Sequence, residues 1–401
     1  MDERSSLAVV AGGATLGLAA LWLHRRRRAP RRSALRTRRL APDLEVTVLG
    51  CGGASLGDLY VETTHECALA TLRAALDAGI QFFDTAPWYG CGLSEARFGL
   101  GLLRTPRSRF ALNTKVGRFL VPDPRARNAT PAWAHGSHFT VKFDYSGPAL
   151  RRQWEDSLQR TGLGRVDSLV IHDLEPGAHA SDDDPTGVAA TQAHLDALGA
   201  TGFAELCALR ESGAIKAFVA GVNADENGED AQAKDDWNRK YVDALFAMGD
   251  AHARGIDFLL IANCYSLLNF TAHDLGILDD CAARGVSVVI GGPFSSGILA
   301  TGPDPKGGGV AYYNYRPADA AIRDRARKIQ AACGRHGVPL VAAALQFPLG
   351  HPAVASVIPG GKNPAEVRSN VDAMNHPIPA RLWADLKDEG LIPRDARTPP
   401  C

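Results

Sequence analysis

The stretch FFDTAPWYG, residues 82–90, joins an apolar run to two polar side chains, Asp84 and Tyr89. Lys115 stands at the end of a second run in FALNTKVGR, residues 110–118, and His172 at the end of a third in VDSLVIHD, residues 166–173. Buried parallel strands read as near-continuous apolar runs. Each of the four side chains is therefore expected where a strand emerges into solvent, and this shared placement predicts one active site.

Segments of the same kind recur along the whole chain of 401 residues, 45% of which are hydrophobic. The predicted strands are residues 46–50, 81–84, 111–115, 169–172, 217–221, 258–262, 286–291 and 355–358. Helical patterns separate them, and eightfold alternation without an obvious linker predicts an α/β fold, a (β/α)8 TIM barrel. Because the active sites of such barrels lie at the C-terminal ends of the strands, the four side chains are expected to converge.

The first predicted helix shows how the local signals work. Thr63 and Glu66 are spaced as a capping box, and Gly79 is placed to end the helix. Leu72 and Leu76 lie one helical turn apart on the same face. A helix is therefore expected between the first two strands.

Two long excursions, residues 121–143 and 175–200, follow the strands of Lys115 and His172. Both leave the expected catalytic face, so we expect them to shape the substrate pocket or to cover it. His135 and His138 in the first excursion have no repeating ligand spacing, and we interpret them as loop residues. The eight cysteines are scattered singly, which predicts no metal site and a reduced, intracellular protein.

The four polar residues form the set that a hydride-transferring enzyme without a metal requires. A phenol with a pKa of about 10 is a weak acid and is seldom ionised near neutral pH, so Tyr89 needs help. Lys115 would stabilise the phenolate, Asp84 would hold that ammonium, and His172 would orient the reacting oxygen. Taken singly, Asp84, Tyr89 and His172 also have structural interpretations, as a helix or turn cap, a packing tyrosine and a core histidine.

These motifs resemble the aldo-keto reductase family, whose Asp, Tyr, Lys and His tetrad corresponds to Asp84, Tyr89, Lys115 and His172. The stretches VDSLVIHD, FSSGILATG (294–302), YNYRPA (313–318) and VIPGGKNPAEVRSN (357–370) resemble one branch of it. That branch contains D-threo-aldose 1-dehydrogenase (L-fucose dehydrogenase), L-galactose dehydrogenase and pyridoxal 4-dehydrogenase. The resemblance covers residues 44–385 and implies an NAD(P)-dependent oxidoreductase.

The resemblance also implies where the cofactor binds. The family places a lysine just after Ile-Pro and an arginine two residues beyond the helix proline, both suited to a 2'-phosphate. Here Gly360 and Glu366 occupy those positions, which favours NAD because a carboxylate repels a phosphate and accepts hydrogen bonds from a ribose diol. NADP is the alternative, since Lys362 and Arg368 lie close by in sequence.

Four further cofactor contacts follow from the resemblance. Asn370 matches the asparagine that contacts adenine, and Asn223 falls where the family has a polar contact to the carboxamide. Many relatives stack an aromatic ring on the nicotinamide from the strand preceding PFSSG, but the matching residue here is Gly291. Phe294 is the candidate substitute.

Trp88, beside Tyr89, offers an aromatic wall suited to a sugar face or a heteroaromatic ring. The branch implies oxidation of an aldose of the L-fucose, L-galactose or D-threo type at C1 to the lactone, with Tyr89 as base and NAD as hydride acceptor. One alternative is an NADP-linked reductase of an aldehyde such as pyridoxal, with Tyr89 as acid. The other is a catalytically slow, cofactor-sensing partner subunit, which would bind nucleotide without multiple turnovers.

The N-terminal residues differ from the rest in composition. Residues 5–23 are uncharged and mostly apolar, about 28 Å long if helical, and an arginine cluster follows them. We interpret residues 1–40 as a membrane anchor or an organelle-targeting segment, residues 44–385 as the barrel and residues 386–401 as a tail. The arginines would keep an anchored barrel on the cytosolic side.

Removal of residues 1–40 changes the charge balance. The remaining chain has 34 Lys and Arg against 42 Asp and Glu, a net charge of −8. An acidic barrel discourages polyanion binding, and no aromatic partner accompanies the arginine cluster, so no nucleic-acid partner is expected. The expected partner is a small sugar or aldehyde.

Overall fold

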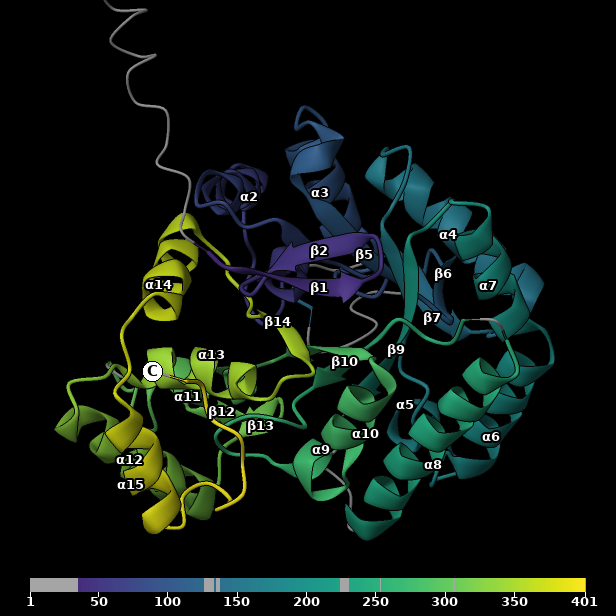
Figure 1. Cartoon of the computed structure of the whole chain (residues 1–401). Coiled ribbons are helices and arrows are strands. Elements are labelled where there is room, and N and C mark those ends of the chain that lie inside the picture. Colours follow the sequence, from purple (N-terminus) through teal and green to yellow (C-terminus); the bar gives the residue numbers. More distant parts are fainter. Residues whose placement is uncertain are drawn as a thin grey trace, which may run out of the picture.

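A closed barrel of parallel strands organises the computed structural model, which describes residues 35–125, 133–134, 138–223, 231–252, 254–305 and 307–400 (Figure 1). Hydrogen-bonded neighbours run in chain order around the sheet, so the predicted (β/α)8 barrel is confirmed. The eight strands are β3 (Cys51–Gly52), β4 (Phe82–Asp84), β5 (Ala111–Val116), β8 (Ser168–Ile171), β9 (Ala217–Asn223), β10 (Phe258–Ala262), β11 (Ser287–Gly291) and β14 (Val354–Ile358). Backbone bonds from Gly50 N to Val357 O (2.8 Å) and from Gly52 N to Pro359 O (2.9 Å) close it.

The first strand differs from the prediction. Residues 46–50 were expected to form it, but Val46 belongs to an antiparallel hairpin of β1 (Thr37–Ala41) and β2 (Leu44–Thr47). The barrel strand begins after that hairpin, where Leu49 bridges Val357 and β3 pairs with β4. An apolar alternation cannot distinguish a hairpin strand from a barrel strand when the two follow one another directly, which is why the boundary was misplaced.

Helices follow the strands and surround the sheet. They are α2 (His65–Asp77), α3 (Leu93–Leu102), α4 (Gly147–Thr161), α5 (Pro176–His179), α6 (Val188–Ala197), α7 (Phe203–Glu211), α8 (Ala231–Asp250), α9 (Thr271–Asp274), α10 (Ile277–Arg284), α11 (Ile298–Thr301), α12 (Ala320–Arg335), α13 (Leu340–Gln346), α14 (Pro364–Met374) and α15 (Ala380–Asp388). The cap of α2 is Thr64, whose hydroxyl accepts from Cys67 N (3.2 Å), and not the predicted Thr63. Thr63 N is bound by the Asp58 carboxylate (2.9 Å), so the helix begins one residue later.

The apolar residues form two groups that explain which end of the barrel holds the site. One group fills the layer between the strands and the helices. The other fills the barrel interior, where Leu40, Leu44 and Val46 of the hairpin meet inward side chains such as Phe82 and Val170. Burial of these side chains stabilises the closed sheet. The hairpin thus fills the N-terminal end, and the polar residues lie at the C-terminal end.

The described parts of the two long excursions contain helices and strands and lie against each other. The first contains the hairpin of β6 (Arg118–Pro122) and β7 (Phe139–Phe143), and the second contains α5 and α6. The rings of Phe143 and His179 are 4.3 Å apart, and those of His179 and His194 are 4.7 Å apart. His135 and residues 1–34, including the predicted anchor at 5–23, lie outside the described residues. In the part that is described, no helix combines the length and apolarity needed to cross a bilayer.

Candidate active site

A cavity of about 370 Å³ opens at the C-terminal end of the barrel strands. Five of the predicted site residues line it: Trp88, Tyr89, Lys115, His172 and Asn223. They come from the segments after β4 and β8 and from β5 and β9 themselves, which are neighbours in the sheet. The sequence-distant side chains therefore converge as a TIM barrel requires.

Asp84 lies directly beneath this cavity and is joined to Lys115. Lys115 Nζ donates to Asp84 Oδ2 (2.7 Å) and to Thr85 O (2.9 Å), and Asn113 Nδ2 donates to Asp84 Oδ1 (2.6 Å). The contact follows from the register, because Asp84 is opposite Asn113 and Lys115 is two residues further along the same face of β5. Burial raises the pKa of Asp84, and the attraction of Lys115 opposes that shift.

Tyr89 is held between Lys115 and His172. Lys115 Nζ lies 4.6 Å from the centroid of the phenol ring, and the imidazole of His172 meets the ring edge to face at 6.1 Å between centroids. Part of Tyr89 is open to the cavity, yet burial raises its pKa well above 10, and Asp84 adds to the shift while Arg118 opposes it. The phenol of the ligand-free site is therefore protonated at neutral pH, the form that acts as an acid.

His172 is neutral in this site. Burial lowers its pKa to about 3, although the adjacent Asp173 favours the charged form. Its Nε2 lies 3.2 Å from Asp173 Oδ1. A carboxylate at that distance favours the tautomer with hydrogen on Nε2, so this nitrogen is a donor that faces the residues of the cavity.

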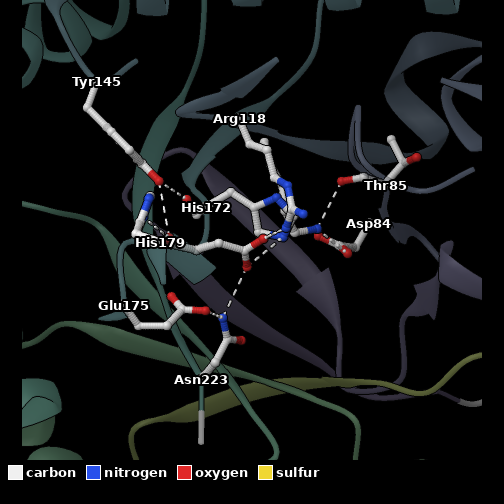
Figure 2. A network of polar contacts seen from close by, with 10 residues as sticks. Asp84, Thr85, Arg118, Tyr145, His172, Glu175, His179 and Asn223 are labelled. Atoms are coloured by element: carbon white, nitrogen blue, oxygen red, sulfur yellow. Dashed lines mark hydrogen bonds and ion pairs between the residues drawn. The ribbon is translucent and has the colours of Figure 1, made fainter. Parts of the chain in front are cut away.

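Arg118 and Asp173 are cavity residues that the sequence did not indicate. Arg118 Nη1 is ion-paired with Asp173 Oδ2 beside His172 (Figure 2). The guanidinium of Arg118 also lies 3.8 Å from the centroid of the Trp88 ring. Gly117 allows Arg118 to point toward the cavity, because its φ of 98° turns the chain away from the direction of β5. A larger residue would not fit at this position, since a Cβ there would lie 2.1 Å from the ring of Tyr145. The sequence feature that could have indicated Arg118 is a basic residue directly after a glycine at the end of a strand.

Trp88 lines the cavity as predicted, but not as a bare aromatic wall. Arg118 covers one side of its ring, and Trp133 meets it edge to face at 5.6 Å between centroids. Trp133, from the first excursion, also lines the cavity and lies 6.0 Å from the ring of Tyr89. The wall is thus a cluster of two indoles and a guanidinium.

Tyr315 reaches the cavity from a tight hairpin turn. It is the second central residue between β12 (Tyr312–Tyr313) and β13 (Arg316–Pro317), and both central residues have positive φ, 44° at Asn314 and 62° at Tyr315. Such a turn usually carries glycine or asparagine, so a tyrosine there is strained. Tyr315 lines the cavity and is hydrogen-bonded to the side chain of Asn263.

The predicted cofactor residues fall into two places. Asn223 lies in the cavity wall, where its Nδ2 donates to Asp173 Oδ1 (3.2 Å) and Glu175 Oε1 (2.8 Å). Gly291 ends β11 next to Leu260 and Ala262, which line the cavity, whereas Phe294 is half-buried and packs against the core.

The second place is the connection from β14 to α14. Asn370 Nδ2 donates to Gly360 O (3.2 Å), while Lys362 and Arg368 are exposed. Ser55 Oγ accepts from Gly361 N (3.1 Å), and the preceding residue, Ala54, lines the cavity. The segment Ala54–Ser55 therefore connects the cavity wall with the residues before α14, whose N-terminus suits an anionic phosphate.

A metal site is absent from the part of the chain that the structure describes, where no group of three or more His, Cys, Asp or Glu side chains could hold an ion. The polar groups of the cavity instead pair with one another, as in the contacts of Asp173 with Arg118 and Asn223.

Comparison with known proteins gives a consistent picture. The model of the aldo/keto reductase family matches residues 48–388. Pyridoxal 4-dehydrogenase of Microbacterium luteolum is 36% identical, and the alignment covers 87% of this chain and 95% of that protein. D-threo-aldose 1-dehydrogenase of Pseudomonas sp is 34% identical, and the alignment covers 88% of this chain and 97% of that protein. The solved holo form of aldo-keto reductase AKR11C1 from Bacillus halodurans shares the fold, with a TM-score of 0.58, 24% identity, and coverage of 88% of this chain and 96% of its own.

Proposed function

The chain belongs to the aldo-keto reductase family and is an NAD(P)-dependent oxidoreductase, and from that premise we propose that it oxidises a cyclic aldose at C1 to the lactone with NAD. The observation that carries the proposal is the polar wall beside His172, formed by the ion pair of Arg118 and Asp173. A polyhydroxylated ring offers partners for each of these groups, which a plain aldehyde does not. The 34% identity to D-threo-aldose 1-dehydrogenase over 97% of that protein supports the same substrate class.

Each member of the tetrad has one role in the proposed reaction. His172 Nε2, whose hydrogen faces Asp173 in the ligand-free site, donates that hydrogen to the C1 oxygen when this oxygen enters and orients it toward Tyr89. Tyr89 accepts the proton of that hydroxyl in oxidation and returns it in reduction. Lys115, fixed by Asp84, stabilises the phenolate. Asn223 and the segment from Gly360 to Asn370 would hold the nicotinamide cofactor, which would supply the hydride acceptor for C1.

We predict a pH profile governed by one ionisation that lies above the range from pH 6 to pH 9. Since burial raises the pKa of Tyr89, the base form needed for oxidation becomes about tenfold more abundant with each pH unit below that pKa. The kcat/KM for oxidation should therefore rise from pH 6 to pH 9, while that for reduction stays flat. His172, with its pKa lowered to about 3, contributes no limb in this range. An acid limb near pH 6 that is absent in His172→Gln would contradict the assignment.

The preference for NAD rests on Glu366. Its carboxylate accepts from Lys362 N (3.0 Å) and Asn363 Nδ2 (3.0 Å), and Lys362 Nζ lies 3.9 Å away. The lysine that could bind a 2'-phosphate is thus already beside a negative charge. A phosphate placed there would meet that carboxylate as well.

Glu366→Gln tests this preference because it keeps an acceptor oxygen and removes the charge. We expect the ratio of kcat/KM for NAD to that for NADP to fall about tenfold, which corresponds to ~1.4 kcal/mol. Glu155→Gln, exposed on α4, is the matched control and should leave the ratio unchanged. An unchanged ratio in Glu366→Gln would show that this carboxylate does not select the cofactor.

The proposed function is tested by following NAD reduction by the purified full chain with a panel of L-fucose, L-galactose, other aldoses and pyridoxal. Multiple turnovers with an aldose and formation of the lactone are expected. The 36% identity to pyridoxal 4-dehydrogenase favours pyridoxal as the second candidate, and turnover of pyridoxal alone would establish it instead. Cofactor binding without turnover of any substrate would indicate a sensing subunit.

We propose that the residues before the β1–β2 hairpin form an anchor or targeting segment, on the basis of the apolar run 5–23 and the arginines that follow it. Residues 37–40 are excluded from it, because they belong to β1 and Leu40 is buried in the barrel interior. Fractionation of cells that express the full chain, or the chain from residue 35 onward, tests this. The full chain should appear with membranes or in an organelle, and the shortened chain should not. Identical distributions would rule out both roles.

A further inference from the structure

Asp173 directly follows His172 and has a backbone conformation that is unusual for a residue other than glycine. Its φ of 52° lies in the left-handed region, where a side chain costs energy. Two side chains hold its carbonyl oxygen: Tyr145 Oη donates at 3.2 Å and His179 Nε2 donates at 2.8 Å. Strain that the surroundings maintain in this way is concentrated at functional sites.

The strained turn brings the Asp173 carboxylate into the cavity wall. Oδ1 lies 3.2 Å from His172 Nε2 and accepts from Asn223 Nδ2 at 3.2 Å, while Oδ2 is paired with Arg118 (Figure 2). The residue is 8% exposed and lines the cavity. Burial disfavours its charge, but the contacts with His172 and Arg118 keep the pKa of Asp173 below its ordinary value. The carboxylate is therefore an ionised acceptor beside the group that binds the reacting oxygen.

Arg118 supplies a donor in the same place. Its guanidinium carbon lies 3.8 Å from the centroid of the Trp88 ring and 5.1 Å from the centroid of the Phe143 ring. These rings and the ion pair fix the direction of the guanidinium, so less rotational freedom is lost when it binds a ligand. The wall next to His172 thus presents a fixed acceptor and a fixed donor together.

The C2 hydroxyl of an aldose is next to its C1 oxygen, and the Asp173 carboxylate is next to His172, with 3.2 Å between Oδ1 and Nε2. A C1 oxygen that accepts the hydrogen of His172 Nε2 takes the place of this contact and brings the C2 hydroxyl beside the carboxylate. Resting on the proposed function, we propose that Asp173, oriented by Arg118, binds the C2 hydroxyl and makes the enzyme selective for aldoses that carry one. The hydroxyl donates to the carboxylate and accepts from the guanidinium.

The test compares L-fucose with 2-deoxy-L-fucose in the wild-type chain and in Asp173→Asn. Asparagine tolerates the left-handed region best among the non-glycine residues and has the same shape, so the variant should fold, which a thermal melt checks. Wild type should lose about 30- to 100-fold in kcat/KM when the C2 hydroxyl is absent, as expected for a hydrogen bond to a charged group. Asp173→Asn should lose activity on L-fucose and show less than a ~5-fold difference between the two sugars.

Comparing the two ratios cancels the different intrinsic reactivities of the sugars, as in a double-mutant cycle. Asp196→Asn, an exposed carboxylate on α6, is the control and should keep the wild-type ratio. A general structural defect would lower both rates equally and keep the ratio, and that outcome overturns the inference. So does a wild type that oxidises both sugars equally well. Wild type that oxidises neither sugar overturns the proposed function itself.

Discussion

Tyr89→Phe should lower kcat by about 10³-fold in both directions, since it removes the only group proposed to move the proton. The change deletes a single oxygen and keeps the ring that packs between Lys115 and His172, at 4.6 Å and 6.1 Å. Steady-state turnover of the aldose with NAD, and of the lactone or aldehyde with NADH, measures the loss. Binding energy for substrate and cofactor is made elsewhere in the cavity, so KM should change little.

The controls for this variant separate chemistry from folding. Cofactor affinity, measured by fluorescence, should stay within about twofold, because no proposed cofactor contact involves the phenol oxygen. The melting temperature should be maintained as well. Full turnover in Tyr89→Phe would refute the proton-transfer role. Loss of cofactor binding would show that the hydroxyl contributes to cofactor binding, so that the lower kcat could not be assigned to proton transfer alone.

The barrel was predictable because its signals are local. Each strand buried on both faces reads as an apolar run, and the ends of parallel strands meet at one edge, so Asp84, Lys115 and His172 could be expected together. The β1–β2 hairpin escaped prediction because it merges with the first strand in one apolar alternation. The cap of α2 moved by one residue because the Asp58 side chain, not the local pattern, binds Thr63 N.

The polar wall was not predictable for a different reason. Arg118 reaches the cavity only through the turn at Gly117, and Asp173 only through its positive φ, and neither direction can be read from residue type. Tyr315 arrives from a hairpin more than 140 positions beyond His172 in the sequence. Contacts of this kind depend on loop geometry, which pattern reasoning describes least well.

The largest effect on stability is expected for Lys115→Met. The side chains of Lys115 and Asp84 are 2% and 3% exposed, so the variant leaves a buried carboxylate without its cation. Removing one partner of a buried pair typically costs about 3–5 kcal/mol, and we expect the free energy of unfolding to fall by ~3 kcal/mol at pH 7. Because burial already raises the pKa of Asp84, the folded variant should take up a proton there. Its stability is then highest at acid pH and is lost as pH rises through the folded-state pKa.

The double variant Asp84→Asn with Lys115→Met separates the structural role of the pair from its proposed catalytic role. An amide oxygen in the place of Asp84 Oδ1 still accepts from Asn113 Nδ2, which lies 2.6 Å from that position. Chemical denaturation should therefore show a smaller loss than in Lys115→Met, with a coupling of about 1–3 kcal/mol between the two sites. The kcat should stay as low as in the single variant, because Tyr89 still lacks its ammonium. Recovery of turnover together with stability would mean that Lys115 acts on the fold alone and leaves the phenol unaffected.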